Sequence, residues 1–350
     1  MKTAIVLFNL GGPLQKADIK PFLFNFFMDK NIIAAPLPIR YFIAKYISRT
    51  RGEGAALEAY GRLGFKSPLL QNTQAQAQAL EAAMNVRMPD VHDMVEVFVS
   101  MRYWEPSAED TVDALEAYGP DRIVMLPLYP EYSTTTTKSS FENFWRAVQG
   151  ADGDLHKRWD DIAVHRIGCY PLQKGFVDAS ADLIAFSLKQ APAGTRVLFS
   201  AHGLPEKIVQ GGDPYQDHCE KSAAAIAAKL GLDKTQWRIC YQSRIGPLKW
   251  IGPSIREELE QAAKDKVGVV VYPHAFVSEH VETLVELDEE FKKEAEHLGV
   301  PYYARVPTVS THPLFIDGLA DMVMEEIAGK KQPRVCGGKF TRCGCVSEAA

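Results

Sequence analysis

The chain has 350 residues, of which 46% are hydrophobic and 24% are charged, and its formal net charge at pH 7 is -5. This length predicts two domains rather than one core. The negative charge and the absence of a basic stripe argue against nucleic acid as a partner. No apolar run reaches the roughly 18 residues of a membrane-spanning helix.

Short apolar segments alternate with helical stretches along the chain. Strands are predicted at 3–8, 95–100, 122–126, 196–200, 237–241 and 267–272, with helices at 73–84, 108–117, 174–189 and 255–264. Strands that alternate with helices of this length form βαβ units, so the sequence predicts an α/β fold with parallel sheets flanked by helices. The first strand runs straight into a Gly-Gly-Pro turn, unlike a secretory signal, and we expect a cytoplasmic protein.

Two strand-to-loop junctions have similar sequences, at 5–13 and 197–205. Both read as an apolar strand, a small polar residue and a turn with glycine and proline. The similarity is either a coincidence or the trace of two similar α/β halves. In both cases ligand sites are expected at the carboxyl ends of the strands.

The segment 21–33, PFLFNFFMDKNII, is unusually aromatic. Four phenylalanines within seven residues cannot all face one core from a single helix. The exposed part would meet an apolar ligand or a membrane surface. The alternative is a helix buried between two domains.

Two groups of polar residues follow predicted strands. His202 follows the strand 196–200, where an imidazole can accept a proton or bind a metal, although a lone histidine is often structural. Glu282, Glu286 and Glu290 share one helix face, close to His280. That face is either solvated or a carboxylate track that conducts a divalent cation or protons toward His280 and Glu282.

Several enzyme classes lack their motifs here. The pair His280-x-Glu282 has no following P-C-x-x-C, which excludes a zinc deaminase. The sequence also contains no H-E-x-x-H, no G-x-G-x-x-G and no Walker-type loop, so a zinc peptidase and a nucleotide enzyme are not supported.

The chain ends in a cysteine-rich segment with Cys336, Cys343 and Cys345 in a C-x₆-C-x-C spacing. Disulfides are not expected in a reducing cytoplasm. Three thiolates are one ligand short of a zinc site or an iron–sulfur cluster, so a fourth ligand must come from elsewhere. Unligated thiols are the alternative. Cys219 and Cys240 are interpreted as ordinary thiols.

Together these motifs resemble the ferrochelatase family, from the N-terminal strand to about Gly329. The matching motifs occur in the family's order at 7–13, 21–33, Tyr60 with Ser67-Pro68, Arg102-Tyr103, 129–136, 200–205, 212–215, 242–253 and 276–288. The resemblance implies two Rossmann-like domains, 1–165 with an apolar lip at 21–33 and 166–330, followed by a cysteine-rich extension at 331–350. It also implies insertion of Fe²⁺ into protoporphyrin IX to form protohaem.

The resemblance assigns site residues as well. It implies that His202 lies on one face of the macrocycle, with Glu282 and its neighbour His280 on the other. His202 and Glu282 would contact Fe²⁺, and Glu286 and Glu290 would form the acidic track. The residues implied to bind the porphyrin are Leu10, Phe26, Ile32, Tyr60, Ser67, Arg102, Tyr103 and Trp250.

Some bacterial members of the family have a similar tail and take a fourth ligand from the region that holds Cys169 here. The resemblance therefore implies a [2Fe–2S] cluster bound by Cys169, Cys336, Cys343 and Cys345. Alternatives that stay open are coproporphyrin III as substrate, a non-catalytic porphyrin- or haem-binding protein, and a cobalt or nickel chelatase. The lip suggests peripheral contact with the inner face of the membrane. The sequence assigns no oligomeric state.

Overall fold

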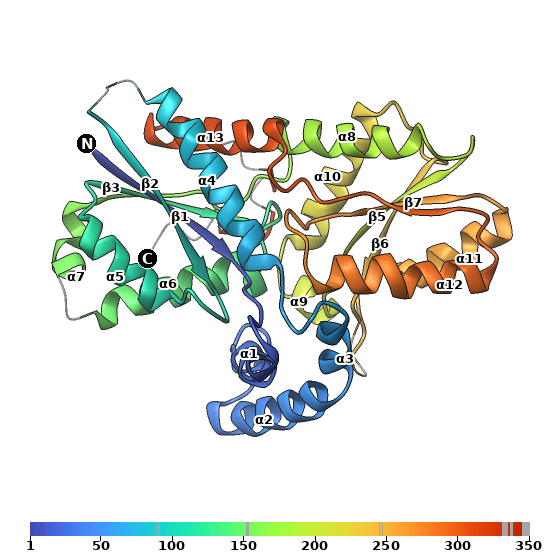
Figure 1. Ribbon diagram of the computed structural model, residues 1–350, viewed down its shortest axis with the longest axis horizontal. Helices are drawn as coiled ribbons and strands as arrows, with labels where there is room; N and C mark the ends of the chain where they lie inside the picture. The colour runs from blue at the N-terminus through green and yellow to red at the C-terminus, as the bar shows by residue number, and fades with distance from the viewer. Residues whose placement is uncertain are drawn as a thin grey trace. The chain divides into compact units, whose positions relative to one another are not determined.

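The computed structural model contains two compact units, each built around a four-stranded parallel sheet (Figure 1). Unit 1 consists of Met1–Tyr129, Ser133–Gly168 and Ala320–Gln332, and unit 2 consists of Pro130–Tyr132, Cys169–Leu319 and Pro333–Ala350. The structure describes all residues except 89, 91, 152–153, 245, 247, 331–334, 337–338 and 345–350.

Unit 1 has the strand order β2-β1-β3-β4, and all its strands are parallel. The strands are β1 (Lys2–Asn9), β2 (Met94–Met101), β3 (Arg122–Pro127) and β4 (Ala163–Arg166). The helices are η1 (Lys16–Asp18), α1 (Ile19–Phe27), α2 (Leu37–Glu53), α3 (Ala55–Arg62), α4 (Leu69–Arg87), α5 (Ala108–Tyr118), η2 (Thr134–Lys138), α6 (Ser139–Gly150), α7 (Asp154–Arg158) and η3 (Trp159–Asp161).

The central strand β1 is buried on both faces, as expected for a parallel sheet covered by helices. Ala4, Val6 and Phe8 pack with residues of α5 and α6. The alternate residues point to the opposite face, which α4 covers (Figure 1). The helix α5 begins where Ser107 and Asp110 form a reciprocal capping box, because the serine hydroxyl accepts a hydrogen bond from the Asp110 amide at 3.1 Å.

Unit 2 repeats this arrangement with the strand order β6-β5-β7-β8. The strands are β5 (Arg196–His202), β6 (Trp237–Gln242), β7 (Val269–Pro273) and β8 (Tyr303–Arg305). The helices are α8 (Lys174–Leu188), α9 (Glu206–Gln210), α10 (Tyr215–Lys229), α11 (Ile255–Asp265), η4 (Glu282–Glu290), α12 (Phe291–Leu298) and α13 (Pro313–Ile327), whose residues from Ala320 onward belong to unit 1.

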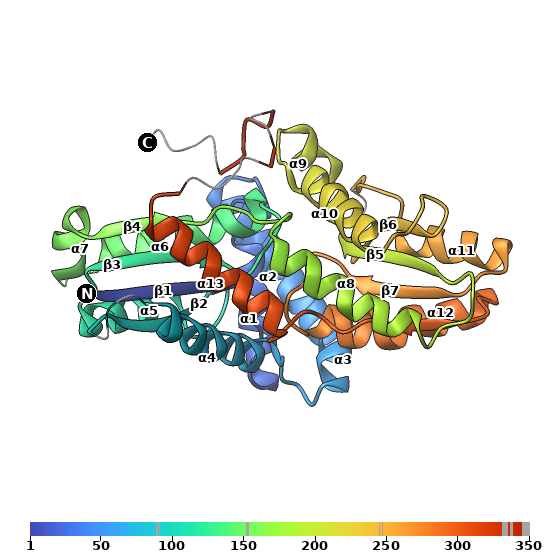
Figure 2. The same cartoon turned by 90° about the horizontal axis from the view of Figure 1, so that it is seen from above.

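The two faces of the unit 2 sheet have separate apolar cores. Val197 and Phe199 pack against α8 and α10 on one face, while Leu198 and Cys240 pack against α11 and α12 on the other (Figure 2). Neighbouring residues of β5 therefore serve different cores, which explains why this strand is uniformly apolar. The α/β fold with parallel sheets flanked by helices is confirmed.

The identical strand order accounts for the similar junctions noted in the sequence. The first follows β1 and the second follows β5, and these strands hold the same place in their sheets. In each sheet the chain crosses to one neighbour first and later to the other, so the carboxyl ends of these strands form a topological switch point where ligands bind. The six predicted strands are all present, whereas the short edge strands β4 and β8 were not predicted.

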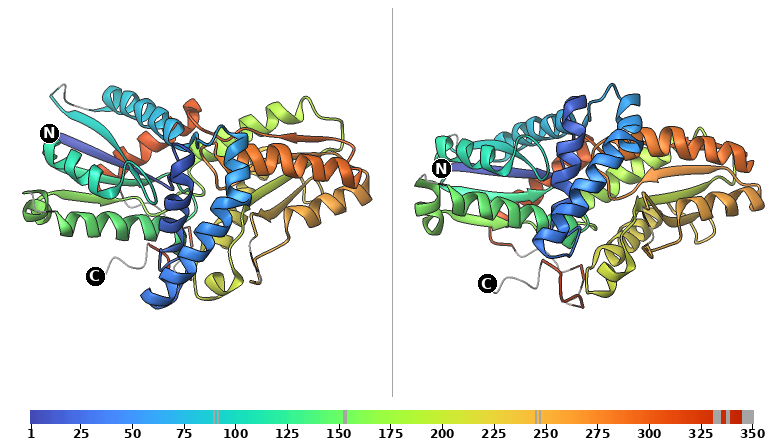
Figure 3. Two further views of the ribbon diagram at one scale, coloured as in Figure 1. Left: turned by 60° about the horizontal axis from the view of Figure 1, so that its bottom comes forward. Right: turned by 90° about the horizontal axis from the view of Figure 1, so that it is seen from below.

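The aromatic segment forms α1 and packs against α2 within unit 1 (Figure 3). Phe22 and Phe27 are buried, while Phe24 and Phe26 stay half-buried, so the four rings do not share one core. None of the described helices is long and apolar enough to cross a membrane.

Candidate active site

The carboxyl end of β5 places His202 beside the helix η4 of the same unit. His202 Nε2 lies 3.4 Å from Glu282 Oε1, and the two side chains are 33% and 28% exposed. On the other ring nitrogen, His202 Nδ1 lies 2.6 Å from the carbonyl oxygen of Gly203. A carbonyl can only accept, so Nδ1 donates a proton and Nε2 is the nitrogen left to exchange protons or bind a metal.

Glu282 is held between two histidines. Its second oxygen, Oε2, lies 3.1 Å from Nε2 of His280. His280 is buried, and its backbone N–H donates to the Thr283 hydroxyl at 3.0 Å. The ring of Phe276 packs on the imidazole with a centroid separation of 4.7 Å. The carboxylate is therefore fixed by an imidazole on each oxygen.

His202 and Glu282 each stabilise the charged form of the other. Burial opposes protonation of His202, but the Glu282 carboxylate outweighs it and raises the pKa of the imidazole to about 9. Burial alone would raise the pKa of Glu282, and the neighbouring His202 instead holds it well below its ordinary value. At neutral pH the resting pair is thus an imidazolium and a carboxylate.

The expectation that His202 and Glu282 face each other across a macrocycle stays a prediction, and it requires the two side chains to separate. At 3.4 Å the two side chains are in direct contact. A flat ring needs about 3.5 Å of van der Waals separation on each of its faces, so no ring fits between them. The two residues instead present one shared site, with Nε2 and Oε1 as neighbouring donor atoms.

The acidic track leads away from this pair along η4, which is a π-helix rather than the α-helix expected from the sequence. Such helices occur often at functional sites. The carboxylate of Glu286 accepts hydrogen bonds from the Gln242 side chain at 3.1 Å and from the Ser243 backbone at 2.8 Å. Burial and the nearby Glu282 charge raise the pKa of Glu286. Glu290 is exposed.

Gln242 joins these groups, although the sequence analysis assigned it no role. Its side-chain amide donates to the Glu282 carbonyl at 3.0 Å and to Glu286, and its oxygen accepts from the Ser200 hydroxyl at 2.8 Å. Its place at the end of β6, next to the strand of His202, was the available signal.

Trp250 lies next to the loop that carries His202. A Cβ on Gly203 would come within 3.2 Å of the Trp250 ring and 3.0 Å of the Gln242 carbonyl oxygen. A side chain at this position would therefore be tightly packed against both neighbours, which favours glycine. The indole Nε1 is buried without a hydrogen-bond partner among the described residues.

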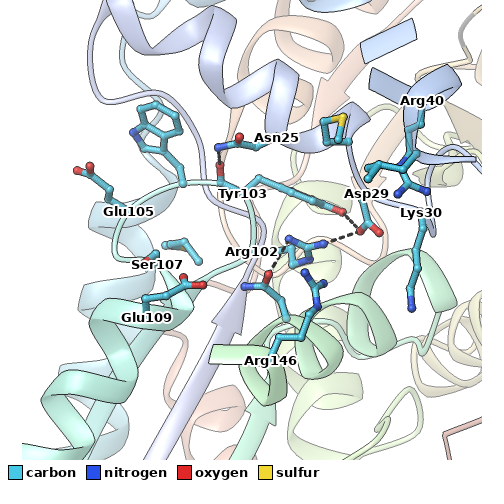
Figure 4. Close-up of a pocket in the computed structure, with 15 residues that line it drawn as sticks. Asn25, Asp29, Lys30, Arg40, Arg102, Tyr103, Glu105, Ser107, Glu109 and Arg146 are labelled. Atoms are coloured by element: carbon cyan, nitrogen blue, oxygen red, sulfur yellow. Dashed lines mark hydrogen bonds and ion pairs between the residues drawn. The ribbon is translucent and has the colours of Figure 1, made fainter. Parts of the chain in front are cut away.

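In unit 1 two of the predicted pocket residues, Arg102 and Tyr103, bind the carboxylate of Asp29 (Figure 4). It accepts hydrogen bonds from the Tyr103 hydroxyl at 2.7 Å and from the Ser139 hydroxyl, and it pairs with Arg102 at 3.0 Å. Burial disfavours the charge of Asp29, but Arg102 and the hydroxyl donors lower its pKa. Asp29 was not predicted as a site residue from the sequence. An acidic residue inside an aromatic segment was the signal, because a buried carboxylate needs partners.

A cavity of about 580 Å³ opens beside this network. Lys30, Arg40, Arg102 and Arg146 contribute cations to its lining, and Asp29, Glu105 and Glu109 contribute carboxylates. Of the residues expected to bind the porphyrin, Arg102 and Tyr103 line it. Their charged and hydroxyl groups are directed to Asp29 (Figure 4).

The other expected pocket residues of unit 1 surround these elements. Phe26 packs on the Tyr103 ring at 5.0 Å, and Ile32 is half-buried. The Leu10 carbonyl accepts from the Tyr103 backbone at 3.0 Å. Tyr60 is buried in α3, and Ser67 is buried just before α4.

The tail cysteines are partly within the described residues, and they belong to unit 2. Cys336 Sγ lies 3.2 Å from Cys343 Sγ, and both are buried. The five described cysteines form no disulfide. Cys169 is half-buried, and Cys345 lies outside the described residues. Two converging thiols fit a shared iron, so the donor set that the structure describes is compatible with a cluster.

A sequence model of the ferrochelatase family matches residues 2–327. The chain is 46% identical over 358 residues to a protein named ferrochelatase from Caulobacter vibrioides, covering 100% of this chain and 99% of that protein. It is 41% identical over 352 residues to a Rickettsia felis protein of the same name, covering 98% of each.

Solved structures with the same fold are more distant in sequence. SirB from Bacillus subtilis, solved with Fe³⁺, has a TM-score of 0.55 at 15% identity and covers 94% of this chain and 97% of that one. A multi-domain Deinococcus radiodurans protein described as similar to chelatases has a TM-score of 0.51 at 14% identity, covering 97% of this chain and 57% of that one. These likenesses confirm the chelatase fold.

Proposed function

The chain belongs to the ferrochelatase family, and we propose that it inserts Fe²⁺ into protoporphyrin IX to form protohaem, with His202 and Glu282 at the reacting centre. The observation that supports these roles is the His202–Glu282 pair at the switch point of unit 2, with Nε2 and Oε1 only 3.4 Å apart. Imidazole and carboxylate are suitable ligands for Fe²⁺.

Metal insertion exchanges protons for a cation. Two pyrrole N–H protons must leave as Fe²⁺ enters the ring. In the resting pair, Nε2 of His202 already carries a proton because Glu282 stabilises it. Fe²⁺ that binds to Nε2 and Oε1 displaces that proton to solvent. When the ion moves into the porphyrin, His202 Nε2 accepts one of the two pyrrole protons and the second leaves through Glu286 to solvent.

Protons and cations travel along the acidic face of η4. Glu286 comes next after Glu282, and its raised pKa makes it a proton carrier nearer to neutral pH than an exposed glutamate. Gln242 and Ser243 orient its carboxylate. Glu290 completes the route at the surface.

The resemblance also assigns residues that contact the porphyrin. Arg102 and Tyr103 fix the lip at 21–33 through Asp29, since both side chains bond to that carboxylate. The porphyrin contacts proposed from the resemblance are Leu10, Phe26, Ile32, Tyr60, Ser67, Arg102, Tyr103 and Trp250.

The [2Fe–2S] cluster is a separate proposal. Cys336 and Cys343 would bind it together with Cys169 and Cys345. Insertion of Fe²⁺ changes no oxidation state, so the cluster would supply structural cross-linking rather than electrons. Its tail is attached to unit 2, since the Val335 carbonyl accepts from Lys221 at 2.9 Å. The family match ends at residue 327, before the tail.

We also propose a cytoplasmic protein that binds the inner face of the membrane through α2. Ile39, Phe42 and Tyr46 are 54%, 70% and 71% exposed, and their spacing puts them on one helix face. Lys45 and Arg49 on the same helix would attract anionic lipid headgroups.

Metal insertion tests the catalytic assignment. We expect His202→Ala and Glu282→Gln to reduce anaerobic Fe²⁺ insertion by about 10²-fold or more, since each removes a proton-transfer or metal-binding group. Glu296→Gln, an exposed carboxylate on the following helix α12, should stay near the wild-type rate. Normal turnover by His202→Ala would contradict the assignment.

The same assay distinguishes the substrates. Protoporphyrin IX should give a higher kcat/KM than coproporphyrin III, because the lip is apolar and coproporphyrin carries more edge carboxylates. A preference for coproporphyrin III would reverse the substrate assignment. Porphyrin binding without turnover of either compound would identify a carrier.

Anaerobically purified protein tests the cluster. We expect charge-transfer absorbance and acid-labile sulfide, both lost in Cys343→Ser and retained in Cys240→Ser, whose thiol lies in β6. Protein without acid-labile sulfide would exclude the cluster in favour of zinc or unligated thiols.

Co-sedimentation with anionic vesicles tests membrane contact. Phe42→Ser should weaken binding by about 10- to 100-fold, because burying a phenylalanine side chain contributes about 1.5–3 kcal/mol. Phe186→Ser on α8 is the matched control, since Phe186 is 66% exposed. Equal losses in the two variants, or no binding by the wild type, would reject α2 as the contact.

A further inference from the structure

Unit 2 contains a second cluster of potential metal ligands that the catalytic proposal does not use. Glu131, Cys219 and His274 each offer one ligand atom, and these atoms all lie within 4.8 Å of one another. In the described part of the chain, this is the one such group of three or more histidine, cysteine or acidic residues. Their exposures are 2%, 0% and 0%.

Two of the candidate ligand atoms lie about as far apart as two atoms that bind one metal ion. His274 Nε2 lies 3.8 Å from Glu131 Oε1. Ligand atoms on a tetrahedral zinc ion, with bonds of about 2.0–2.3 Å, are roughly 3.3–3.8 Å apart. The Ser222 hydroxyl donates to Glu131 Oε1 at 2.9 Å, and His274 Nε2 lies 2.8 Å from that hydroxyl and 3.0 Å from the Cys219 carbonyl oxygen. A metal on Nε2 would therefore select the tautomer that carries the imidazole proton on Nδ1.

The cluster lacks a cation of its own. The basic side chain beside Glu131 among the described residues is His274, which is uncharged because burial lowers its pKa, and no lysine or arginine pairs with the carboxylate. Glu131 Oε2 is buried without a hydrogen-bond partner in the described structure. A buried carboxylate oxygen without a hydrogen-bond partner is normally satisfied by a bound water or an ion. A divalent cation with one carboxylate, one thiolate and a neutral imidazole would leave the site without net charge.

We propose that Glu131, Cys219 and His274 bind a structural divalent transition-metal ion, of which zinc is the best match. Carboxylate, thiolate and imidazole are the three ligand types that zinc takes in proteins. The ion replaces the protons of the Glu131 carboxyl and the Cys219 thiol, which are released to solvent when it binds. This proposal does not depend on the catalytic role of His202 and Glu282.

The ion would join three distant segments of unit 2. Glu131 follows β3, Cys219 lies in α10 and His274 follows β7. The short segment Pro130–Tyr132 belongs to unit 2 although the chain on both sides of it belongs to unit 1. Glu131 is thus the residue through which the ion fixes this segment.

Metal content of the full-length protein tests the proposal. The Cys336→Ser/Cys343→Ser double variant is used as background, so that the tail thiols bind no metal. After growth with zinc and treatment with EDTA, we expect one zinc per chain, released only on unfolding, because the three ligands are buried. Cys219→Ala should lose it. Cys240→Ala, an equally buried thiol on the opposite face of the sheet, should retain it.

X-ray absorption at the zinc edge of the background protein keeps the test valid if Cys219→Ala does not fold. One sulfur ligand together with nitrogen and oxygen ligands is expected. A background protein that retains no ion after EDTA would overturn the proposal in favour of a protonated network. An ion without a sulfur ligand, or one retained equally in Cys219→Ala and Cys240→Ala, would also overturn it.

Discussion

One carboxylate held between two imidazoles organises the candidate active site. Glu282 faces His202 at 3.4 Å and His280 at 3.1 Å, so its charge is compensated on both oxygens. The carboxylate stabilises the His202 imidazolium more than burial destabilises it. In the function proposed above, this pair takes up a divalent cation as it releases the His202 proton, which would couple metal and proton transfer at a single pair of atoms.

The duplicated topology explains why the pair forms where it does. His202 ends β5, and Glu282 begins the π-helix that follows β7, the two strands at the switch point of unit 2. Unit 1 uses the equivalent region differently. There a buried carboxylate, Asp29, pairs with Arg102 and accepts a hydrogen bond from Tyr103. These contacts fix the aromatic segment that carries Asp29. One unit thus carries the exchangeable proton, and the other carries an ion pair that holds the lip.

The sequence predicted the sheets, the strand-end position of His202 and the acidic helix, because strand periodicity and local motifs are short-range properties. The direct contact of His202 with Glu282 was not predictable, since it joins residues 80 positions apart through side-chain rotamers. Asp29, Gln242 and the Glu131–Cys219–His274 cluster were missed for the same reason. Each is an ordinary residue in sequence and becomes informative only through buried neighbours from other elements. The short strands β4 and β8 lack enough residues for a visible pattern.

The coupling of His202 to Glu282 is the central claim, and an NMR titration of the His202 imidazole tests it most directly. Protein labelled with ¹³C-histidine, with the resonance assigned by its absence in His202→Ala, should give a pKa of about 9. In Glu282→Gln the pKa should fall, because the charge that favours the imidazolium is gone. A wild-type pKa near the ordinary value of about 6.5, or no change in Glu282→Gln, would contradict the account.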